Sequence, residues 1–269
     1  MQVQDKTYVV TGAGGGIGGE VVATLVSRGA RVAAIDLRQE ALDAMKAKNE
    51  QYADKISLHA VNISDRASVL ALPEQAIAAH GAVDGVINCA GIIQPFVKVN
   101  DLDFDAIERV MNVNFYGTLN MIKAFLPKLL ERPEASLVNV SSMGGFLPVP
   151  GQSVYGASKA AVKLLTEALY AELLETNVHV SVVFPGATNT NITGNSNVTT
   201  PGAGDAKTDK MASKTLSPTE AAHIIVDGMV KQKPQIFTGS DSKLMNKLYR
   251  LNPVSATKLI AKQMKSLLS

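Results

Sequence analysis

The sequence predicts an α/β fold in which helices cover both faces of one doubly wound parallel sheet. Short apolar runs alternate with helical patterns between residues 7 and 238, and no Pro/Gly/Ser-rich linker interrupts them. Such uninterrupted apolar runs are typical of strands buried on both faces of a parallel sheet. A glycine-rich segment also joins the first run to the first helical pattern. We therefore expect a single domain over residues 1–239 and an amphipathic helical extension over residues 240–269.

The individual elements follow from the period of the apolar residues. We expect strands at 7–11, 31–36, 56–62, 84–88, 136–141, 178–184 and 235–238. We expect helices at 17–29, 39–52, 65–80, 101–131, 153–176 and near 218–231. Residues 187–217 are rich in Asn, Thr, Gly and Ser and lack apolar periodicity, which favours a loop beside the site that contacts substrate.

Composition excludes several classes of protein. The net charge is only +2 over 269 residues, so we do not expect the protein to bind nucleic acid. No apolar run is long enough to span a bilayer. Cys89 is the one cysteine and the four histidines are scattered, so we expect neither a disulfide nor a metal site. With Asp5 and Lys6 in place of an apolar signal core, a cytoplasmic protein is expected.

The glycine-rich segment predicts a dinucleotide site. It lies between a strand and a helix, where glycines allow a tight turn and leave the N–H groups of the helix N-terminus free for a pyrophosphate. The next apolar run ends in Asp36, and an acid at about 20 residues beyond the glycines can accept hydrogen bonds from the adenosine ribose. An anion would repel the extra phosphate of NADP, so NAD is the expected cofactor. Arg38, two residues further on, could moderate this preference.

A tyrosine and a lysine stand four residues apart in the helix predicted at 153–176. Tyr155 and Lys159 should therefore project from one face of that helix. A nearby ammonium favours the phenolate and would lower the tyrosine pKa from its ordinary value of about 10. The pair is a candidate for proton transfer.

These pieces and others resemble the short-chain dehydrogenase/reductase family, in the family's order and over roughly residues 5–190. The matching residues are Thr11, Gly12, Gly16 and Gly18, the segment Asn88-Cys89-Ala90-Gly91, Asn114, Ser142, the Tyr155/Lys159 pair, and Pro185-Gly186 with Thr190. The resemblance implies a Rossmann-like three-layer sandwich, a nicotinamide cofactor, and hydride exchange at an alcohol or carbonyl carbon.

The resemblance also implies roles for particular residues. Tyr155 would be the general acid/base, and Lys159 would lower its pKa and hold the nicotinamide ribose. Ser142 would hydrogen-bond the reacting oxygen, with Ser141 as the competing candidate. Asn114 would support a proton relay at a distortion in the long helix.

The glycine loop, the strand ends and the resemblance together define an expected cofactor site. Its residues are Gly12, Gly14, Gly15, Gly16, Ile17, Gly18, Asp36, Leu37, Asn62, Ile63, Asn88, Ala90, Gly91, Tyr155, Lys159, Pro185, Gly186, Thr188 and Thr190. Two departures from the family pattern are visible: Cys89 replaces an asparagine, and Asn62 stands where many relatives have an aspartate. An Asn side chain can both donate and accept there, so we expect binding to be retained.

The expected assembly is a homodimer or homotetramer, with a dimer through helices 101–131 and 153–176 preferred. The extension carries an apolar stripe, Leu244, Leu248, Leu251, Leu259, Met264 and Leu267, beside six lysines and arginines. We expect this stripe to pack on its own or a partner subunit, with contact to an anionic membrane surface as the less favoured alternative.

The sequence therefore predicts an NAD-dependent oxidoreductase of largely apolar secondary alcohols or ketones. The expected substrate pocket is built by Gly144, Phe146–Val149 and the loop 187–217, with the extension as a further candidate wall. It contains no fixed charge before Asp205. One alternative is an NADPH-dependent 3-oxoacyl reductase. The other is a non-catalytic dinucleotide-binding sensor or scaffold.

Overall fold

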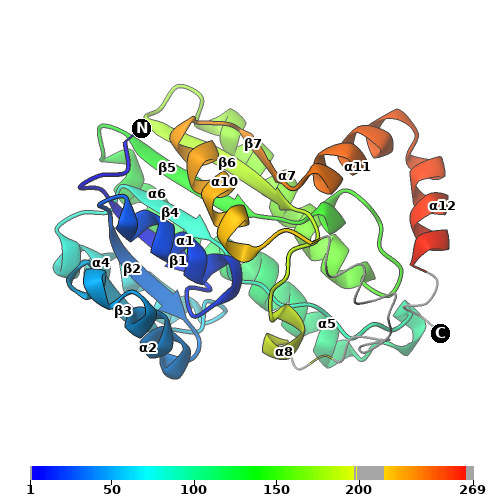
Figure 1. Ribbon diagram of the computed structural model, residues 1–269, viewed down its shortest axis with the longest axis horizontal. Coiled ribbons are helices and arrows are strands. Elements are labelled where there is room, and N and C mark those ends of the chain that lie inside the picture. The colour runs from blue at the N-terminus through cyan, green and yellow to red at the C-terminus, as the bar shows by residue number, and fades with distance from the viewer. Residues whose placement is uncertain (1, 197, 199–214, 265–269) are drawn as a thin grey trace.

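The computed structural model describes residues 2–196, 198 and 215–264, and they form a three-layer α/β sandwich (Figure 1). All seven strands are parallel, in the order β3-β2-β1-β4-β5-β6-β7. The strands are β1 (Thr7–Thr11), β2 (Arg31–Asp36), β3 (Ile56–Ala60), β4 (Gly85–Asn88), β5 (Ala135–Val140), β6 (Val178–Pro185) and β7 (Gln235–Thr238). The predicted fold class is confirmed, and each strand lies within two residues of its predicted bounds.

The order of the strands reverses between β1 and β4. From β1 the chain first winds outward through β2 and β3 and then returns to β4 on the other side. Ligands of open parallel sheets bind outside the carboxyl ends of the strands at such a switch point. The glycine-rich segment after β1 and the segment after β4 both lie there.

The helices divide into two layers that cover opposite faces of the sheet. The bounds are α1 (Gly16–Ser27), α2 (Gln39–Lys48), α3 (Arg66–Leu70), α4 (Leu72–His80), α5 (Phe104–Met111), α6 (Thr118–Leu130), α7 (Ser153–Glu172), α8 (Ile192–Asn195), α10 (Pro218–Val230), α11 (Ser240–Leu251) and α12 (Pro253–Gln263). One core cluster joins α1, α2 and α10 to the sheet, and a second joins α3, α4, α6 and α7 to the other face.

Four predicted helices are shorter or divided; the one expected at 153–176 is α7 and ends at Glu172. The helix expected at 39–52 ends at Lys48 and is followed by a 3₁₀ segment, η1 (Glu50–Lys55). The helix expected at 65–80 is interrupted at Ala71, because the proline in LPEQ begins a new helix. The helix expected at 101–131 consists of α5, a π-helical segment η3 (Asn112–Gly117), and α6. Only short 3₁₀ turns, η2 (Val99–Asp101) and η4 (Met143–Gly145), precede α5 and α7.

The extension forms α11 and α12, which pack on the body through a small cluster. Leu147, Ala256 and Ile260 are its buried members, with Met245, Tyr249 and Met264 beside them. Of the predicted apolar stripe, Met264 packs on the subunit as expected. For the leucines that expectation is wrong within the subunit, because Leu244, Leu248, Leu251 and Leu259 are between 36% and 82% exposed. The buried side of α11 is the one that carries Ser242, Met245 and Tyr249, and the leucines lie on another side of the helix. Leu267 lies outside the described residues.

The start of α11 is hydrogen-bonded to the end of β6 and to the loop that follows it. The buried Ser242 hydroxyl donates to the Phe184 carbonyl at 2.9 Å, and an Asp241 carboxylate oxygen accepts from the Ala187 N–H at 2.9 Å. Hydrogen bonds therefore attach the start of the extension to the end of β6 and to the loop that follows it. Most of the loop predicted at 187–217, including Asp205, lies outside the described residues. Within the described residues, no helix combines the length and apolar content that a bilayer crossing requires.

Candidate active site

A cleft of about 390 Å³ opens at the switch point of the sheet. It brings together the loops that follow β1, β2, β3 and β4, which are far apart in the sequence. Of the predicted cofactor residues, the following line it: Gly12, Gly14, Gly15, Gly16, Ile17, Gly18, Asp36, Leu37, Asn62, Ile63, Ala90, Gly91 and Thr190. Ile92, Val113 and Asn195 line it as well and were not predicted.

The glycine loop leaves no room for side chains where it packs and stays open where a ligand would bind. A Cβ on Gly18 would lie 2.2 Å from the Gly12 carbonyl oxygen, whereas a Cβ on Gly15 would meet nothing within 4 Å. Gly12 and Gly16 have φ of +68° and +56°, which favour glycine. No side chain caps the N-terminus of α1. Its first N–H groups and the positive end of the helix dipole are therefore available for a phosphate.

Asp36 lies at the edge of this loop. One carboxylate oxygen accepts from the Gly14 N–H at 3.0 Å, and the other accepts from the Arg38 N–H at 3.3 Å. The Arg38 guanidinium donates to the Asn195 side-chain oxygen on α8 at 3.1 Å. Arg38 thus joins the rim of the cleft to the segment that covers its other side.

The candidate proton-transfer group, Tyr155, stands on the first turn of α7 beside Ser142. Burial raises the pKa of the Tyr155 phenol, and a hydrogen bond with the Ser142 side chain partly opposes that rise. The Ser142 hydroxyl oxygen also accepts from the Gly144 N–H at 3.0 Å, which orients it at the start of η4. Ser141, the competing candidate, is buried and donates to the Lys159 carbonyl at 2.7 Å, so its hydroxyl is committed to the backbone.

Lys159 is only 4% exposed, and its ammonium donates to the Val140 carbonyl at 3.0 Å. Burial lowers its pKa to about 8. The expected lowering of the Tyr155 pKa by Lys159 is not found, because burial dominates at Tyr155 and the ammonium is bonded to the end of β5. A Cβ on Gly91 would lie 2.9 Å from the Lys159 Nζ, so the ammonium adjoins the wall of the cleft.

Asn114 lies in the π-helical segment and joins two loops of the site. Its Oδ1 accepts from the Ile92 N–H at 2.8 Å, and its Nδ2 donates to the Ile92 carbonyl at 2.9 Å and to Ser158 Oγ at 2.9 Å. The distortion implied by the family resemblance therefore places a fully buried amide between the segment after β4 and α7.

Some predicted cofactor residues lie outside the cleft lining. Asn88 is buried at the end of β4 and donates to Asn139 Oδ1 at 2.8 Å, while its own Oδ1 has no hydrogen-bond partner among the described residues. Pro185 ends β6, and Thr188 donates to the Gly186 carbonyl at 3.1 Å. These residues shape the loops around the cleft.

Gln94 was missed by sequence reasoning. Its side chain is fully buried, and its Oε1 accepts from the N–H groups of Val154 and Tyr155 at 2.7 and 3.0 Å. Its Nε2 donates to the Gly151 carbonyl at 3.0 Å. Because no residue of the helix's own start caps α7, Gln94 supplies the cap from another part of the chain. Local sequence around Gln94 carries no signal for this contact.

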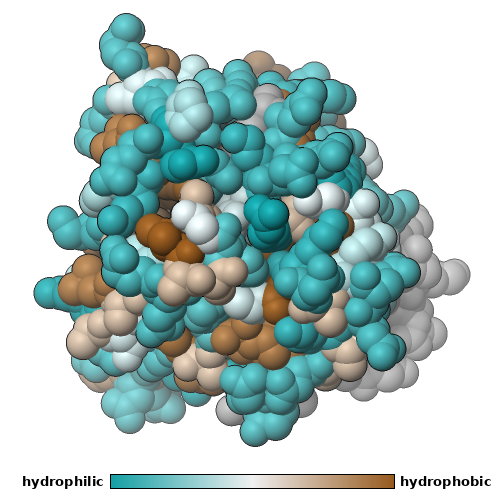
Figure 2. All heavy atoms as spheres, turned by 90° about the vertical axis from the view of Figure 1, so that its left-hand side faces the viewer, coloured by the Kyte–Doolittle hydropathy of each residue, from teal (hydrophilic) through white to brown (hydrophobic). Residues whose placement is uncertain are grey.

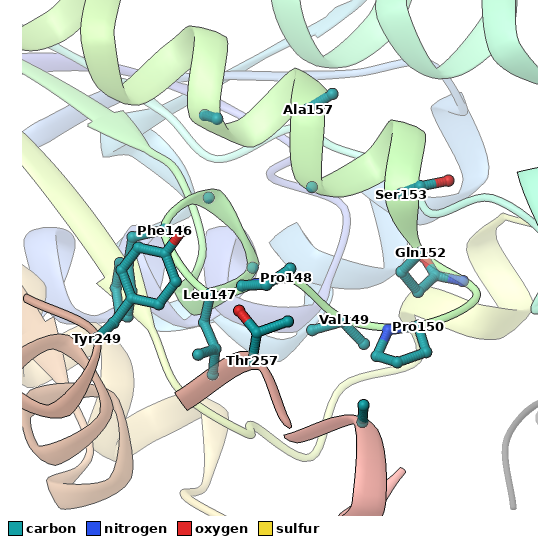
Figure 3. A pocket seen from close by; sticks show the side chains of 15 residues that line it. Phe146, Leu147, Pro148, Val149, Pro150, Gln152, Ser153, Ala157, Tyr249 and Thr257 are labelled. Atoms are coloured by element: carbon teal, nitrogen blue, oxygen red, sulfur yellow. The ribbon is translucent and has the colours of Figure 1, made fainter. Parts of the chain in front are cut away.

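A second cavity, of about 510 Å³, lies between η4, α7 and the two C-terminal helices (Figure 3). The predicted pocket residues Gly144 and Phe146–Val149 line it, together with Tyr249, Thr257 and Ala261 of the extension. No charged side chain is among its described lining residues. Tyr155 does not line it, but a Cβ on Gly144 would lie 3.5 Å from Ser142 Oγ and from the Tyr155 ring. The cavity is thus next to the candidate catalytic groups.

Comparison with known proteins establishes the family. A family model for short chain dehydrogenase matches residues 6–200. SadH of Mycobacterium tuberculosis, which is named as an oxidoreductase, is 33% identical over 263 residues, or 96% of this chain and 95% of SadH. The 3-oxoacyl-acyl-carrier-protein reductase FabG of Thermotoga maritima is 33% identical over 195 residues, covering 72% of this chain and 78% of FabG. The chain therefore belongs to the short-chain dehydrogenase/reductase family of oxidoreductases.

Solved structures agree on the fold. A short chain dehydrogenase/reductase from Burkholderia phymatum, determined in complex with NAD, has a TM-score of 0.81 over 93% of this chain and 96% of that one. Its sequence identity is 24%, so the similarity supports the Rossmann-like architecture and does not extend to the cofactor.

Replacing Gln94 by Met should destabilise the protein and lower its turnover. The change leaves two partly buried N–H groups at the start of α7 without an acceptor, which should reduce the free energy of unfolding by about 2–4 kcal/mol. The matched control is Gln152→Met, which removes one hydrogen bond, to the Gln94 carbonyl, and should cost about 1 kcal/mol. Urea denaturation and steady-state turnover measure both effects. Equal behaviour of the two variants would contradict the capping role of Gln94.

Proposed function

We propose that this protein transfers a hydride between NAD(H) and a secondary alcohol or ketone that is largely apolar. The observation that carries the proposal is the position of Tyr155. Its phenol is bonded to Ser142 and stands one helical turn from the buried Lys159, whose ammonium adjoins the cleft at Gly91. A proton donor, an oxygen-binding hydroxyl and a cation thus lie beside a cleft shaped for a dinucleotide.

The described residues fit a nicotinamide dinucleotide. The uncapped start of α1 and the open space at Gly15 suit a pyrophosphate, and Asp36 suits a ribose with two free hydroxyls. Lys159, whose ammonium adjoins the cleft wall at Gly91, would hold the second ribose. When bound, this group would supply or accept the hydride.

Our mechanism assigns the proton to Tyr155 and the orientation of substrate to Ser142. In reduction, the carbonyl carbon gains the hydride while the Tyr155 phenol donates its proton to the carbonyl oxygen, which Ser142 holds by a hydrogen bond. In oxidation, the Tyr155 phenolate accepts the proton of the alcohol as the hydride leaves carbon. The hydrogen bond with Ser142 favours that phenolate and burial opposes it, so the role left to the Lys159 cation is to hold the ribose of the cofactor. Asn114 positions the segment at Ile92 and α7 through Ser158.

The lining of the second cavity supports an apolar substrate. A fixed charge on the substrate would find no partner among its described residues, whereas Phe146, Leu147 and Val149 offer apolar contacts. The similarity to FabG supports a 3-oxoacyl reductase as the second candidate. Asp36 argues against the NADPH dependence expected for that function. A non-catalytic sensor is disfavoured because binding alone does not require Ser142, Tyr155 and Lys159 together.

We also propose a homo-oligomer that uses α5, α6 and α7. Large apolar side chains remain exposed on these helices, including Phe104 (80%) and Leu164 (67%). Exposed apolar surface of this kind is typical of subunit interfaces. Whether the assembly is a dimer or a tetramer depends on contacts beyond one subunit.

Replacing Tyr155 by Phe should remove turnover and leave cofactor binding nearly unchanged. The ring still packs, but the proton donor is lost, so kcat should fall at least about 100-fold. Tyr170→Phe, on the exposed part of the same helix, is the matched control and should behave as the wild type. Oxidation of NADH with a panel of apolar ketones measures kcat, and fluorescence titration measures NADH binding. Near-normal kcat in Tyr155→Phe would refute the proposed mechanism.

The pH dependence should differ between the two directions. Lys159 has a lowered pKa of about 8, so its cation is present below that pH and is lost as the pH rises through it. Ketone reduction needs this cation and the protonated Tyr155, so its kcat/KM should be flat near pH 7 and fall above about pH 8. Alcohol oxidation needs the phenolate and the same cation, so its kcat/KM should rise up to about pH 8 and level off above that pH. Reduction that accelerates from pH 7 to pH 9 would contradict the assignment.

Asp36 should set a preference for NAD over NADP. Its carboxylate can accept from both ribose hydroxyls and would repel a 2'-phosphate. Asp36→Ala should narrow the ratio of kcat/KM for NAD and NADP by about tenfold or more, and Asp54→Ala, an exposed acid in η1, should leave the ratio unchanged. A wild-type protein that uses NADPH more efficiently than NADH would overturn the NAD assignment while leaving the oxidoreductase class intact.

A further inference from the structure

The two C-terminal helices form a surface that the body of the protein leaves uncovered. In Figure 1, α11 and α12 project at one end of the molecule, beyond the sheet and its two helical layers. Their inner sides pack on Leu147 and its neighbours, which accounts for the buried Ala256 and Ile260. Their outer sides have no protein over them among the described residues.

Large apolar side chains occupy this outer surface. Leu244, Leu248 and Leu251 follow one another at helical spacing on α11 and are 54%, 36% and 82% exposed. Val254 and Leu259 of α12 are 64% and 41% exposed. We call the three α11 residues Leu244, Leu248 and Leu251 the leucine stripe; the exposed Val254 and Leu259 adjoin it on α12. Leaving so much apolar surface in water is unfavourable, so we expect another surface to cover the stripe.

Cations flank the leucine stripe. Lys243, Lys247 and Arg250 lie one position before the three leucines of α11, and Lys258 and Lys262 lie on α12. Within the described residues none of these five forms an ion pair. The one acid of α11 and α12 is Asp241, which is bonded to the Ala187 N–H at the root of the extension. Residues 240–264 thus carry a charge of +4, although the whole chain carries only +2.

The opposite end of the molecule differs. Figure 2 views the molecule from the side away from the extension, and this face is predominantly hydrophilic with apolar residues in scattered positions. That face therefore differs from the outer side of α11, where three exposed leucines follow one another along one helix.

We propose that α11 and α12 dock on an anionic lipid surface, with the leucine stripe in the acyl boundary and the cations at the headgroups. Apolar side chains beside lysines and arginines, on helices too short to span, are the features of helices that lie in a membrane interface. A second copy of this surface is a poorer occupant, because a two-fold contact would place the same five cations against one another. This placement reverses the sequence-based expectation that the stripe is covered by protein.

The test is flotation of the full-length protein with vesicles at low ionic strength. Vesicles of phosphatidylcholine with one third phosphatidylserine should carry the protein, and vesicles of phosphatidylcholine alone should carry at least about tenfold less. Raising the salt to about 1 M should release most of the bound protein, since screening then acts within about 3 Å.

Two variants separate the contributions of charge and apolar contact. Lys243→Glu with Lys247→Glu, and separately Leu244→Ser with Leu251→Ser, should each reduce binding to anionic vesicles at least about tenfold. The matched control, Lys48→Glu with Lys231→Glu, makes the same change in net charge at exposed positions outside the extension and should bind as the wild type. Unchanged melting temperatures establish that the variants are folded, because the substituted side chains are exposed.

Three outcomes would overturn the proposal. The first is equal flotation with anionic and neutral vesicles. The second is binding that survives both pairs of substitutions in the extension. The third is no vesicle binding together with a smaller particle for Leu244→Ser/Leu251→Ser in sedimentation velocity, which would assign the leucine stripe to a contact between subunits.

Discussion

The buried ammonium of Lys159 is the constraint on which the site depends. A cation in a protein interior must be hydrogen-bonded, and here the bond goes to the Val140 carbonyl at the end of β5. Gly91 leaves room for the ammonium, and Gly145 lets η4 approach so closely that a Cβ there would lie 2.9 Å from the Lys159 backbone. The ends of β4 and β5 and the start of α7 therefore converge on one charged group. Ser142 and Tyr155 are positioned by the same convergence.

The sequence was sufficient for those parts of the fold that depend on local patterns. Strands buried on both faces appear in the sequence as continuous apolar runs. The glycine loop is recognisable because the glycines that its tight turn requires are neighbours in the sequence. Gln94 could not be predicted, since its role depends on a contact with Tyr155 across about 60 residues of chain. The same holds for the pKa of Tyr155: the spacing to Lys159 is local, whereas the burial that dominates the shift is set by tertiary packing.

The extension shows a different limit of sequence reasoning. Helical periodicity correctly indicated two amphipathic helices, but it did not indicate which side of each helix meets the protein. On α11 the side with Met245 and Tyr249 packs, and the leucines, which a hydropathy pattern would place inside, stay exposed. An apolar stripe on a helix therefore indicates only that this side of the helix is to be covered by other apolar groups. It does not distinguish the core of the same chain from another surface.

Two hydrogen bonds at the first turn of α11 hold the extension in one orientation on the body of the protein. A tether joined by flexible residues would let the body sample many orientations, whereas the buried Ser242 and the carboxylate of Asp241 hold the first turn of α11 against Phe184 and Ala187. The packing of Tyr249 beside Leu147 fixes the next turns. Any surface that binds these helices therefore meets the protein at a fixed angle to the end of β6 and to Ala187.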